Sequence, residues 1–334
     1  METTCTVLGA GSWGTALAIQ LARLDRPTVL WGRDPAQLAV LARERRNVRY
    51  LPDAAFPDAL NIEPELAQAV RAGGDVLLAV PSHALRTMLL DIVPHLQAGA
   101  RVSWATKGFE CDTGLLPHQV ARQVLGEQVA TAVVSGPTFA REVGAGLPTA
   151  MTVAATDPEF ASHLAKRLSG ENFRAYTSSD VIGVEVGGAV KNVLAIGAGI
   201  SDGLGFGANT RIALIARGLA EMTRLGVALG ARQETFMGLA GLGDLVLTCT
   251  DDQSRNRRFG LALATGENVD AAQRDIGQIV EGVRAARAVR DVAQRLRVEM
   301  PICEQVYRVV YGQVPPRDAV KELMNRALKP EMPA

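Results

Sequence analysis

The chain has 334 residues, of which 48% are hydrophobic and 21% are charged, and its formal net charge is zero. This composition is typical of a folded globular protein, and the balanced charge argues against a general nucleic-acid binder. The length exceeds what one hydrophobic core usually supports, so two domains are expected.

The cysteines and histidines indicate the compartment and the absence of a metal. Cys5, Cys111, Cys249 and Cys303 show no metal-binding or disulfide spacing, which indicates free thiols in a reducing compartment. The histidines are scattered, and only His83 lies near the end of a predicted strand. No basic leader opens the chain, and charges interrupt its apolar stretches. We therefore expect a cytoplasmic protein without a metal or a membrane span.

A glycine turn follows the first predicted strand, Thr4–Leu8. Gly9, Gly11 and Gly14 form a GxGxxG pattern that leads directly into a predicted helix, Thr15–Leu24. In this context the glycines allow a tight turn, close approach of a pyrophosphate and packing of helix on strand. A purely structural turn is the alternative, but the strand–turn–helix order favours dinucleotide binding.

The second predicted strand, Thr28–Trp31, is followed by Arg33. An acidic residue near this position usually binds the ribose hydroxyl of NAD, whereas an arginine suits the 2′-phosphate of NADP. Asp34 precedes Pro35 and is expected to cap the next helix instead of binding ribose. The sequence therefore predicts that NADP(H) is accepted at least as well as NAD(H).

Strands and helices continue to alternate up to about Ser179. The further predicted strands are Asp75–Val80, Arg101–Ala105, Val129–Ser135 and the weaker Ala150–Ala154 and Phe173–Thr177, with helices at His83–Leu96 and Pro158–Ser169. Such alternation predicts a mostly parallel, doubly wound sheet whose ligands bind at the carboxyl ends of the strands. Lys107, Gly136 and Thr138 fall at those ends, although a solvated loop lysine is an equal alternative for Lys107.

After Ser179 the pattern becomes helical. The predicted helices are Arg211–Leu225, Gln233–Leu239, Arg258–Ala264, Ile279–Leu296, Ile302–Tyr311 and Asp318–Arg326. The fold class is therefore α/β, a Rossmann-like doubly wound domain over residues 1–182 followed by an all-α domain over residues 183–334. Met237–Cys249 is expected to be a glycine-rich loop that holds Asp244.

Lys191 lies in a helix of small apolar residues within Gly183–Gly218. Lysine occurs five times among 35 basic residues, and a buried ammonium is costly unless it is paired. Unlike arginine, a buried lysine can exchange a proton, with Asp244 as a plausible partner. The alternative is a structural Lys191–Asp244 ion pair without catalysis. Ser254–Arg258 could likewise bind a substrate anion or form a solvated face.

Five stretches of the sequence are distinctive when taken in this order: GAGSWGTALA at Gly9–Ala18, ATKG at Ala105–Gly108, SGPTFAREV at Ser135–Val143, EVGGAVKNVLAIGAGISDGL at Glu185–Leu204 and GLGDLVLTCTDDQSRNRRFG at Gly241–Gly260. Together they resemble the bacterial NAD(P)-dependent glycerol-3-phosphate dehydrogenases. The resemblance continues to Ile279–Val283 and Met300–Ile302 and so covers nearly the whole chain.

The resemblance implies roles for individual residues. Lys191 would be the general acid and base, with Asp244 and Asn192 beside it. The implied substrate contacts are Lys107, Gly136, Thr138, Lys191, Asp244, Ser254, Arg255 and Asn256. The implied cofactor contacts are Gly9, Gly11, Ser12, Trp13, Gly14, Arg33, Tyr50, Lys107, Ala140, Arg255, Ile279 and Glu281.

The implied reaction interconverts dihydroxyacetone phosphate and sn-glycerol 3-phosphate, which supplies phospholipid synthesis. The partner would be a small phosphorylated substrate, and a homodimer is expected. A hydroxyacid dehydrogenase or ketoacid reductase is the rival enzyme, and a cofactor-binding regulator without turnover is the rival outside enzymes. The DDQSRNRRFG segment favours a phosphate over a carboxylate, and the presence of Lys191 and Asp244 argues against a regulator.

Overall fold

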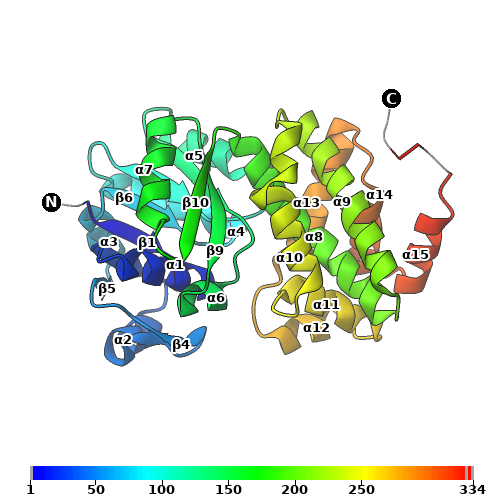
Figure 1. Ribbon diagram of the computed structural model, residues 1–334, viewed down its shortest axis with the longest axis horizontal. Helices are drawn as coiled ribbons and strands as arrows, with labels where there is room; N and C mark the ends of the chain where they lie inside the picture. Colours follow the sequence, from blue (N-terminus) through cyan, green and yellow to red (C-terminus); the bar gives the residue numbers. More distant parts are fainter. Residues whose placement is uncertain (1–2, 328–329, 332–334) are drawn as a thin grey trace.

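The computed structural model describes residues 3–327, 330 and 331. A sheet flanked by helices and a bundle of helices lie side by side along the long axis of the molecule (Figure 1). Every strand among the described residues precedes Asp180, and the regular elements after that residue are helices. The predicted fold class is confirmed.

The main sheet has eight strands in the order β10-β9-β8-β7-β6-β1-β2-β5. Its strands are β1 (Cys5–Leu8), β2 (Thr28–Trp31), β5 (Leu60–Ile62), β6 (Asp75–Leu78), β7 (Arg101–Trp104), β8 (Thr131–Ser135), β9 (Thr149–Ala155) and β10 (Phe173–Ser178). The strands β1, β2, β5, β6, β7 and β8 are parallel to one another. β9 pairs with β8 in antiparallel register, so β9 and its parallel neighbour β10 run in the opposite direction. The strands predicted from the sequence are all present.

Helices cover both faces of the sheet. They are α1 (Ser12–Arg23), α2 (Pro35–Glu44), α3 (Leu66–Ala72), α4 (Ser82–Ile92), α5 (Pro117–Leu125), α6 (Ala140–Ala145) and α7 (Pro158–Leu168), with a short 3-10 turn at Val93–His95. The helices α1, α6 and α7 lie in front of the sheet in Figure 1, and α3, α4 and α5 lie behind it. Asp34 caps α2 as predicted, since its carboxylate accepts the N–H groups of Ala36 and Gln37.

The helical part is built around α8 (Val181–Gly203). The other elements are α9 (Ala208–Ala228), η2 (Gln233–Met237), η3 (Leu239–Gly243), α10 (Asp244–Thr250), α11 (Arg255–Ala264), α12 (Val269–Ile276), α13 (Glu281–Leu296), α14 (Pro301–Tyr311) and α15 (Pro316–Met324). Five of them, α9, α10, α11, α13 and α14, pack around α8, and this is why α8 is apolar on all sides. By length and composition α8 could cross a membrane, but 89% of its most apolar 18-residue window is buried, as in a core helix.

Glycines allow α8 to touch its neighbours directly. A Cβ added to Gly199 would lie 2.0 Å from the carbonyl oxygen of Arg257, and one added to Gly260 would lie 2.1 Å from that of Ile196. The backbones of α8 and α11 are therefore in contact at this crossing. Gly187 similarly allows the carbonyl of Ala240 to approach α8, with 2.3 Å to the added Cβ.

The predicted loop over Met237–Cys249 is wrong. Leu239–Gly243 forms a π-helical turn, and α10 begins at Asp244. The glycines that suggested a loop serve close packing instead, since a Cβ on Gly241 would lie 2.2 Å from the carbonyl oxygen of Phe236. Asp244 is therefore held by the first turn of a helix.

Candidate active site

Lys191, Asp244 and Lys107 form a buried cluster where the two parts of the chain meet. Lys191 on α8 donates to one carboxylate oxygen of Asp244, and Lys107, which follows β7, donates to the other at 2.7 Å. Asp244 is 1% exposed and Lys191 is 7% exposed. The predicted pairing of Lys191 with Asp244 is confirmed, and Lys107 is not the solvated loop lysine of the alternative interpretation.

Thr248 belongs to the same cluster, although it was not among the residues predicted from the sequence. Its hydroxyl lies 3.1 Å from Nζ of Lys191 and donates to the carbonyl oxygen of Asp244 at 2.6 Å. Thr248 stands one helical turn after Asp244 on α10, so the two side chains share a face. The i, i+4 spacing of Asp244 and Thr248 could have indicated this contact, but a loop was predicted for the segment that contains both residues.

The cluster shifts the titration of its own members. Burial lowers the pKa of the Lys191 ammonium to about 8, with Asp244 opposing this shift and Lys107 adding to it. Burial also tends to raise the pKa of Asp244, but the two ammonium groups outweigh that effect and hold it below its ordinary value. Asp244 is therefore an ionised carboxylate, while Lys191 can change its charge near physiological pH.

Lys107 is held in place by the strand ends on one side and by α8 on the other. Its Nζ lies 3.5 Å from the carbonyl oxygen of Gly136, to which Thr138 also donates at 3.2 Å. A Cβ added to Gly188 of α8 would lie 3.2 Å from Cγ of Lys107. The predicted residues at the ends of β7 and β8 are thus brought to the lysine of α8.

A second group of polar side chains lies next to Lys191 along α8. Asn192 accepts from the amide of Asn256 at 2.9 Å, and Asn256 in turn accepts the N–H of Gly282 at 2.8 Å. Asn192 also donates to Glu281, the first residue of α13, at 3.4 Å. These contacts join α8, α11 and α13 beside the lysine cluster.

The start of α11 carries the remaining predicted phosphate ligands. Ser254 is buried and caps α11 by accepting the N–H of Arg257 at 3.2 Å, and Arg255 in the same turn contacts Gln278 at 3.2 Å. Arg257 is buried and pairs with Asp202 at the end of α8 at 2.6 Å. A helix N-terminus with a partly exposed arginine is suited to an anion.

The glycine turn has the geometry that a dinucleotide needs. Gly9 adopts φ +125°, and a Cβ on Gly14 would lie 1.9 Å from the carbonyl oxygen of Gly9, so both positions require glycine. A Cβ on Gly11 would instead meet no atom within 4 Å, which leaves that backbone open to a pyrophosphate. The indole N–H of Trp13 is buried without an acceptor, and Ser12 opens α1. These residues fit the group that the pattern predicts.

Arg33 and Tyr50 lie beside this turn. Gly32 packs on Ala10, and Arg33 next to it is exposed at the carboxyl end of β2. Asn47 joins Tyr50 to the turn, because its side chain donates to the carbonyl oxygen of Ala10 at 3.1 Å and accepts the N–H of Tyr50 at 3.3 Å. Asn47 is fully buried and was also missed from the sequence.

Two predicted cofactor residues lie outside these groups of contacts. Ala140 begins α6, and Ile279 is 48% exposed in the segment before α13. Among the residues that the structure describes, no group of three or more His, Cys, Asp or Glu side chains is placed to hold a metal ion.

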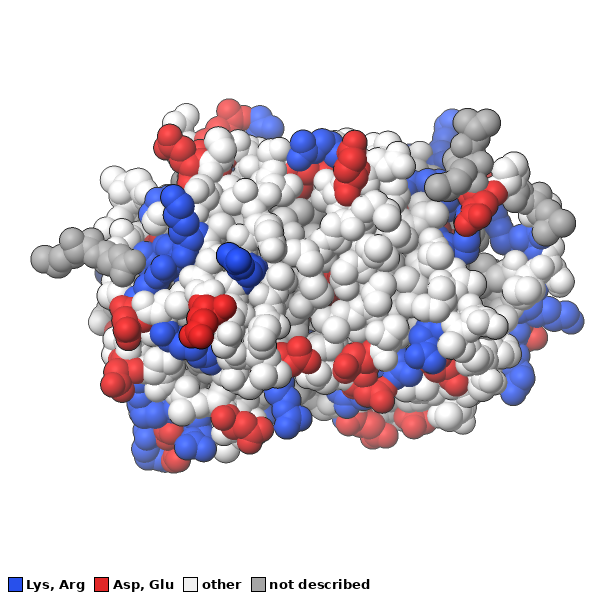
Figure 2. Space-filling model, in the orientation of Figure 1, with Lys and Arg blue, Asp and Glu red and all other residues white. Residues whose placement is uncertain are grey.

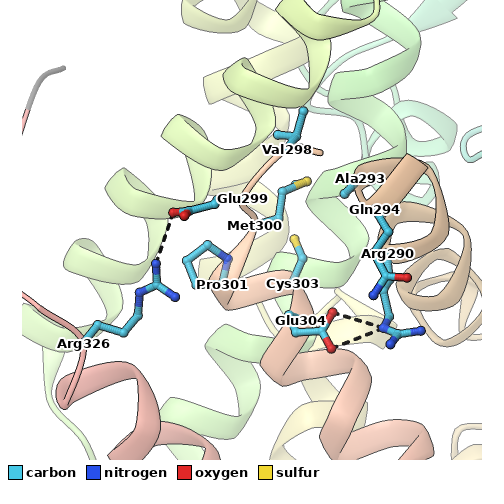
Figure 3. Close-up of a pocket in the computed structure, with 10 residues that line it drawn as sticks. All are labelled: Arg290, Ala293, Gln294, Val298, Glu299, Met300, Pro301, Cys303, Glu304 and Arg326. Carbon is cyan, nitrogen blue, oxygen red and sulfur yellow. Dashed lines mark hydrogen bonds and ion pairs between the residues drawn. The ribbon is translucent and has the colours of Figure 1, made fainter. Parts of the chain in front are cut away.

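A separate cavity lies between the end of α13 and the start of α14, and it contains none of the predicted site residues (Figure 3). Its volume is about 230 Å³. Among the residues that line it, Arg290 pairs with Glu304 and Arg326 pairs with Glu299, so its charges are balanced. It offers no excess positive charge to a phosphorylated substrate.

A pyrophosphate-binding turn and a buried lysine that can exchange a proton are together suited to hydride transfer with a nicotinamide cofactor. The fold and the site assign the chain to the dehydrogenases that use such a cofactor. The chain belongs to the NAD-dependent glycerol-3-phosphate dehydrogenase family. The model of the N-terminal part of this family matches residues 4–161, and the model of its C-terminal part matches residues 180–321.

Individual relatives agree with this assignment. Glycerol-3-phosphate dehydrogenase [NAD(P)+] from Klebsiella pneumoniae is 57% identical over 99% of this chain and 98% of its own length. The structure of glycerol-3-phosphate dehydrogenase from Coxiella burnetii is 46% identical, covers 97% of this chain and 99% of its own, and has a TM-score of 0.94. A ketopantoate reductase from Ralstonia eutropha, 16% identical over 95% of this chain and 99% of its own with a TM-score of 0.59, shares the fold.

Proposed function

We propose that this oxidoreductase interconverts dihydroxyacetone phosphate and sn-glycerol 3-phosphate with NAD(P)H, and that Lys191 moves the proton. The observation that carries this proposal is the shared Asp244 carboxylate, which holds Lys191 and Lys107 together beside the start of α11. The test is NADPH consumption with dihydroxyacetone phosphate, with ketopantoate as the carboxylate comparison. Turnover of ketopantoate alone would contradict the proposal.

In this proposal the substrate lies between two groups of residues. Ser254, Arg255 and Asn256 hold the phosphate, which fixes the C2 carbon near Lys191. Lys107, Gly136 and Thr138 line the opposite side, at the ends of β7 and β8. The glycine turn would hold the pyrophosphate of the cofactor, and the nicotinamide would supply or accept the hydride at C2.

Lys191 completes the reaction by exchanging a proton with the C2 oxygen. During reduction its ammonium donates to the forming alkoxide, and during oxidation its neutral amine accepts the hydroxyl proton. Asp244 orients Nζ through a direct contact and stabilises the ammonium form. Asn192 extends the network toward Asn256 and the phosphate end.

The two directions should have opposite pH dependence. Because burial lowers the pKa of Lys191 to about 8, the ammonium predominates below that pH and the neutral amine above it. The kcat/KM for glycerol 3-phosphate oxidation should rise by about tenfold per pH unit below this pKa and then level off. The kcat/KM for reduction should fall above it. Steady-state rates from pH 6 to 10 check this prediction, and parallel profiles would contradict it.

Arg255→Ala should weaken phosphate binding. Loss of a charge-assisted hydrogen bond corresponds to about 10- to 100-fold in KM for dihydroxyacetone phosphate. Arg258→Ala, an exposed arginine in the same helical turn, is the matched control and should leave KM unchanged. Initial rates over a range of substrate concentrations measure both, and equal KM values for the two variants would refute this role of Arg255.

Arg33→Asp should change the cofactor preference. Arg33 is exposed beside the glycine turn, where its guanidinium can bind a 2′-phosphate. The ratio of kcat/KM for NADPH over NADH should fall by about 10- to 100-fold, the equivalent of one charge-assisted hydrogen bond. Arg43→Asp, an exposed arginine on α2, serves as the control. An unchanged ratio in Arg33→Asp would show that another residue selects the cofactor.

We also propose that the domains meet between residues 182 and 183, that the chain is a cytoplasmic homodimer, and that its product supplies phospholipid synthesis. The C-terminal family match begins at residue 180, which supports the boundary. The cysteines are free thiols, which supports a reducing compartment. Figure 2 shows an area without charged side chains over α9 and α10, and Ile212 of α9 and Val246 of α10 are exposed hydrophobic residues. Light scattering in solution tests the dimer, and a monomer mass would exclude it.

A further inference from the structure

Glu185 is a buried carboxylate that the reaction described above does not use. It lies on α8 and is 3% exposed. One of its oxygens accepts the indole N–H of Trp104 and the backbone N–H of His118, each at 2.9 Å. Its other oxygen lies 2.6 Å from Nδ1 of His118. Three hydrogen bonds therefore join α8 to the last residue of β7 and to the first turn of α5.

These bonds lie next to the lysine cluster on both elements. Trp104 ends β7, and Lys107 follows it by three residues. On α8, Glu185, Gly188 and Asn192 are spaced i, i+3 and i+7, so they share one helical face. Gly188, in the middle of this face, packs on the side chain of Lys107. The same face of α8 is thus fixed to β7 by Glu185 and meets Lys107 one turn later.

We propose that Glu185 is a positioning residue for the reaction, because its hydrogen bonds fix α8 against the end of β7 and so bring Lys191 and Lys107 to one carboxylate. The inference rests on the proposed function for the role of Lys191, but the geometry it describes does not. Without Glu185, the contacts given by the described residues between α8 and the end of β7 near the cluster are the packing of Gly188 on Lys107 and the bonds to Asp244. A shift of about 1 Å between them is enough to cost about 100-fold in rate.

The role depends on hydrogen bonds and not on the negative charge. Burial raises the pKa of Glu185, against the lowering effect of His118 and Trp104. A glutamine at this position can still accept from Trp104 and from the backbone of His118, while its amide group donates to Nδ1 of the neutral imidazole. Glutamine therefore preserves the connection, whereas leucine fills a similar volume and abolishes it.

The test compares Glu185→Gln with Glu185→Leu in the full chain. Glu185→Leu should lower kcat for dihydroxyacetone phosphate reduction by about 10- to 100-fold, while the Kd for NADPH stays unchanged. Glu185→Gln should keep kcat within about threefold of the wild type, because all of its hydrogen bonds can be replaced. Equal losses in both folded variants, or no loss in Glu185→Leu, would overturn the proposal.

A matched control separates positioning from general stability. Glu221 is also a buried carboxylate, 1% exposed, and it accepts the N–H groups of Ile302 and Cys303 at the start of α14, away from the site. Glu221→Leu should lower the melting temperature but leave kcat unchanged, and an equal loss of kcat there would overturn the proposal. If Glu185→Leu does not fold, Trp104→Phe is the second variant. It removes one of the three hydrogen bonds and should also lower kcat, and a kcat equal to that of the wild type would overturn the proposal.

A crystal structure of Glu185→Leu, or of Trp104→Phe if the former does not fold, tests the geometry without any assay. The distance from Nζ of Lys107 to Oδ2 of Asp244, 2.7 Å here, should lengthen. An unchanged distance would overturn the positioning role even if the chain had another substrate. If the wild-type protein does not turn over dihydroxyacetone phosphate, the proposed function is contradicted, but the positioning role of Glu185 is not.

Discussion

Lys191→Ala should lower kcat for dihydroxyacetone phosphate reduction by about 10²- to 10⁴-fold, as expected for the loss of a general acid. The Kd for NADPH should remain unchanged, because the side-chain hydrogen bonds of Lys191 go to Asp244 and Thr248 and not to the glycine turn. Single-turnover measurements with saturating substrate report the chemical step, and fluorescence titration reports cofactor binding.

The matched control is Lys321→Ala, which removes an exposed lysine from α15. It should leave both quantities at wild-type values. A Lys191→Ala variant that raises KM alone would show that Lys191 binds the substrate without exchanging a proton, and a binding role would then replace the catalytic one.

Asp244→Asn should weaken both folding and turnover. It leaves the ammonium groups of Lys107 and Lys191 buried together without a counter-charge, and breaking a buried pair in this way typically costs about 3–5 kcal/mol of stability. It also removes the group that raises the pKa of Lys191, so less ammonium remains for reduction at neutral pH. Denaturant unfolding and kcat at pH 7 measure the two effects.

A second substitution tests the stated cause. Adding Lys107→Met to Asp244→Asn removes the repulsion and should recover part of the lost stability, although not the activity. Asp252→Asn removes an 80% exposed carboxylate near the same site and should leave the unfolding midpoint unchanged. If the double variant is less stable than Asp244→Asn, charge repulsion is not the cause.

The sequence predicted the elements whose local signals agree with their environment. Thr28–Trp31 matches β2 completely, because a short run of branched and aromatic residues ends at a glycine and a capped helix. Elements with weak local signals were missed. β3 (Arg46–Asn47) has two residues and β4 (Leu51–Ala55) contains Pro52 and Asp53, so neither shows the alternation of a strand. Their pairing with each other supplies what the local sequence lacks.

The site could be predicted as a set of residues but not as a network. Sequence reasoning identified Lys191 and Asp244, yet the bond from Lys107 to the same carboxylate spans 137 positions and depends on how the sheet meets α8. Thr248 and Asn47 were missed for a related reason. Thr248 contacts Lys191 and Asn47 contacts the carbonyl oxygen of Ala10 only because the tertiary structure brings them near, and neither residue type is unusual where it stands.

The crossing of α8 and α11 has a consequence for which substrates fit. The two helices are in backbone contact at Gly199 and Gly260. No side chain lies between them at this crossing, so a substitution to a smaller residue cannot bring them closer. This backbone contact therefore fixes the distance from Lys191 on α8 to Ser254 and Asn256 at the start of α11. In the proposed function this distance should limit the number of carbons between the reacting oxygen and the phosphate, and we expect a longer sugar phosphate to be rejected because the two backbones are already in contact.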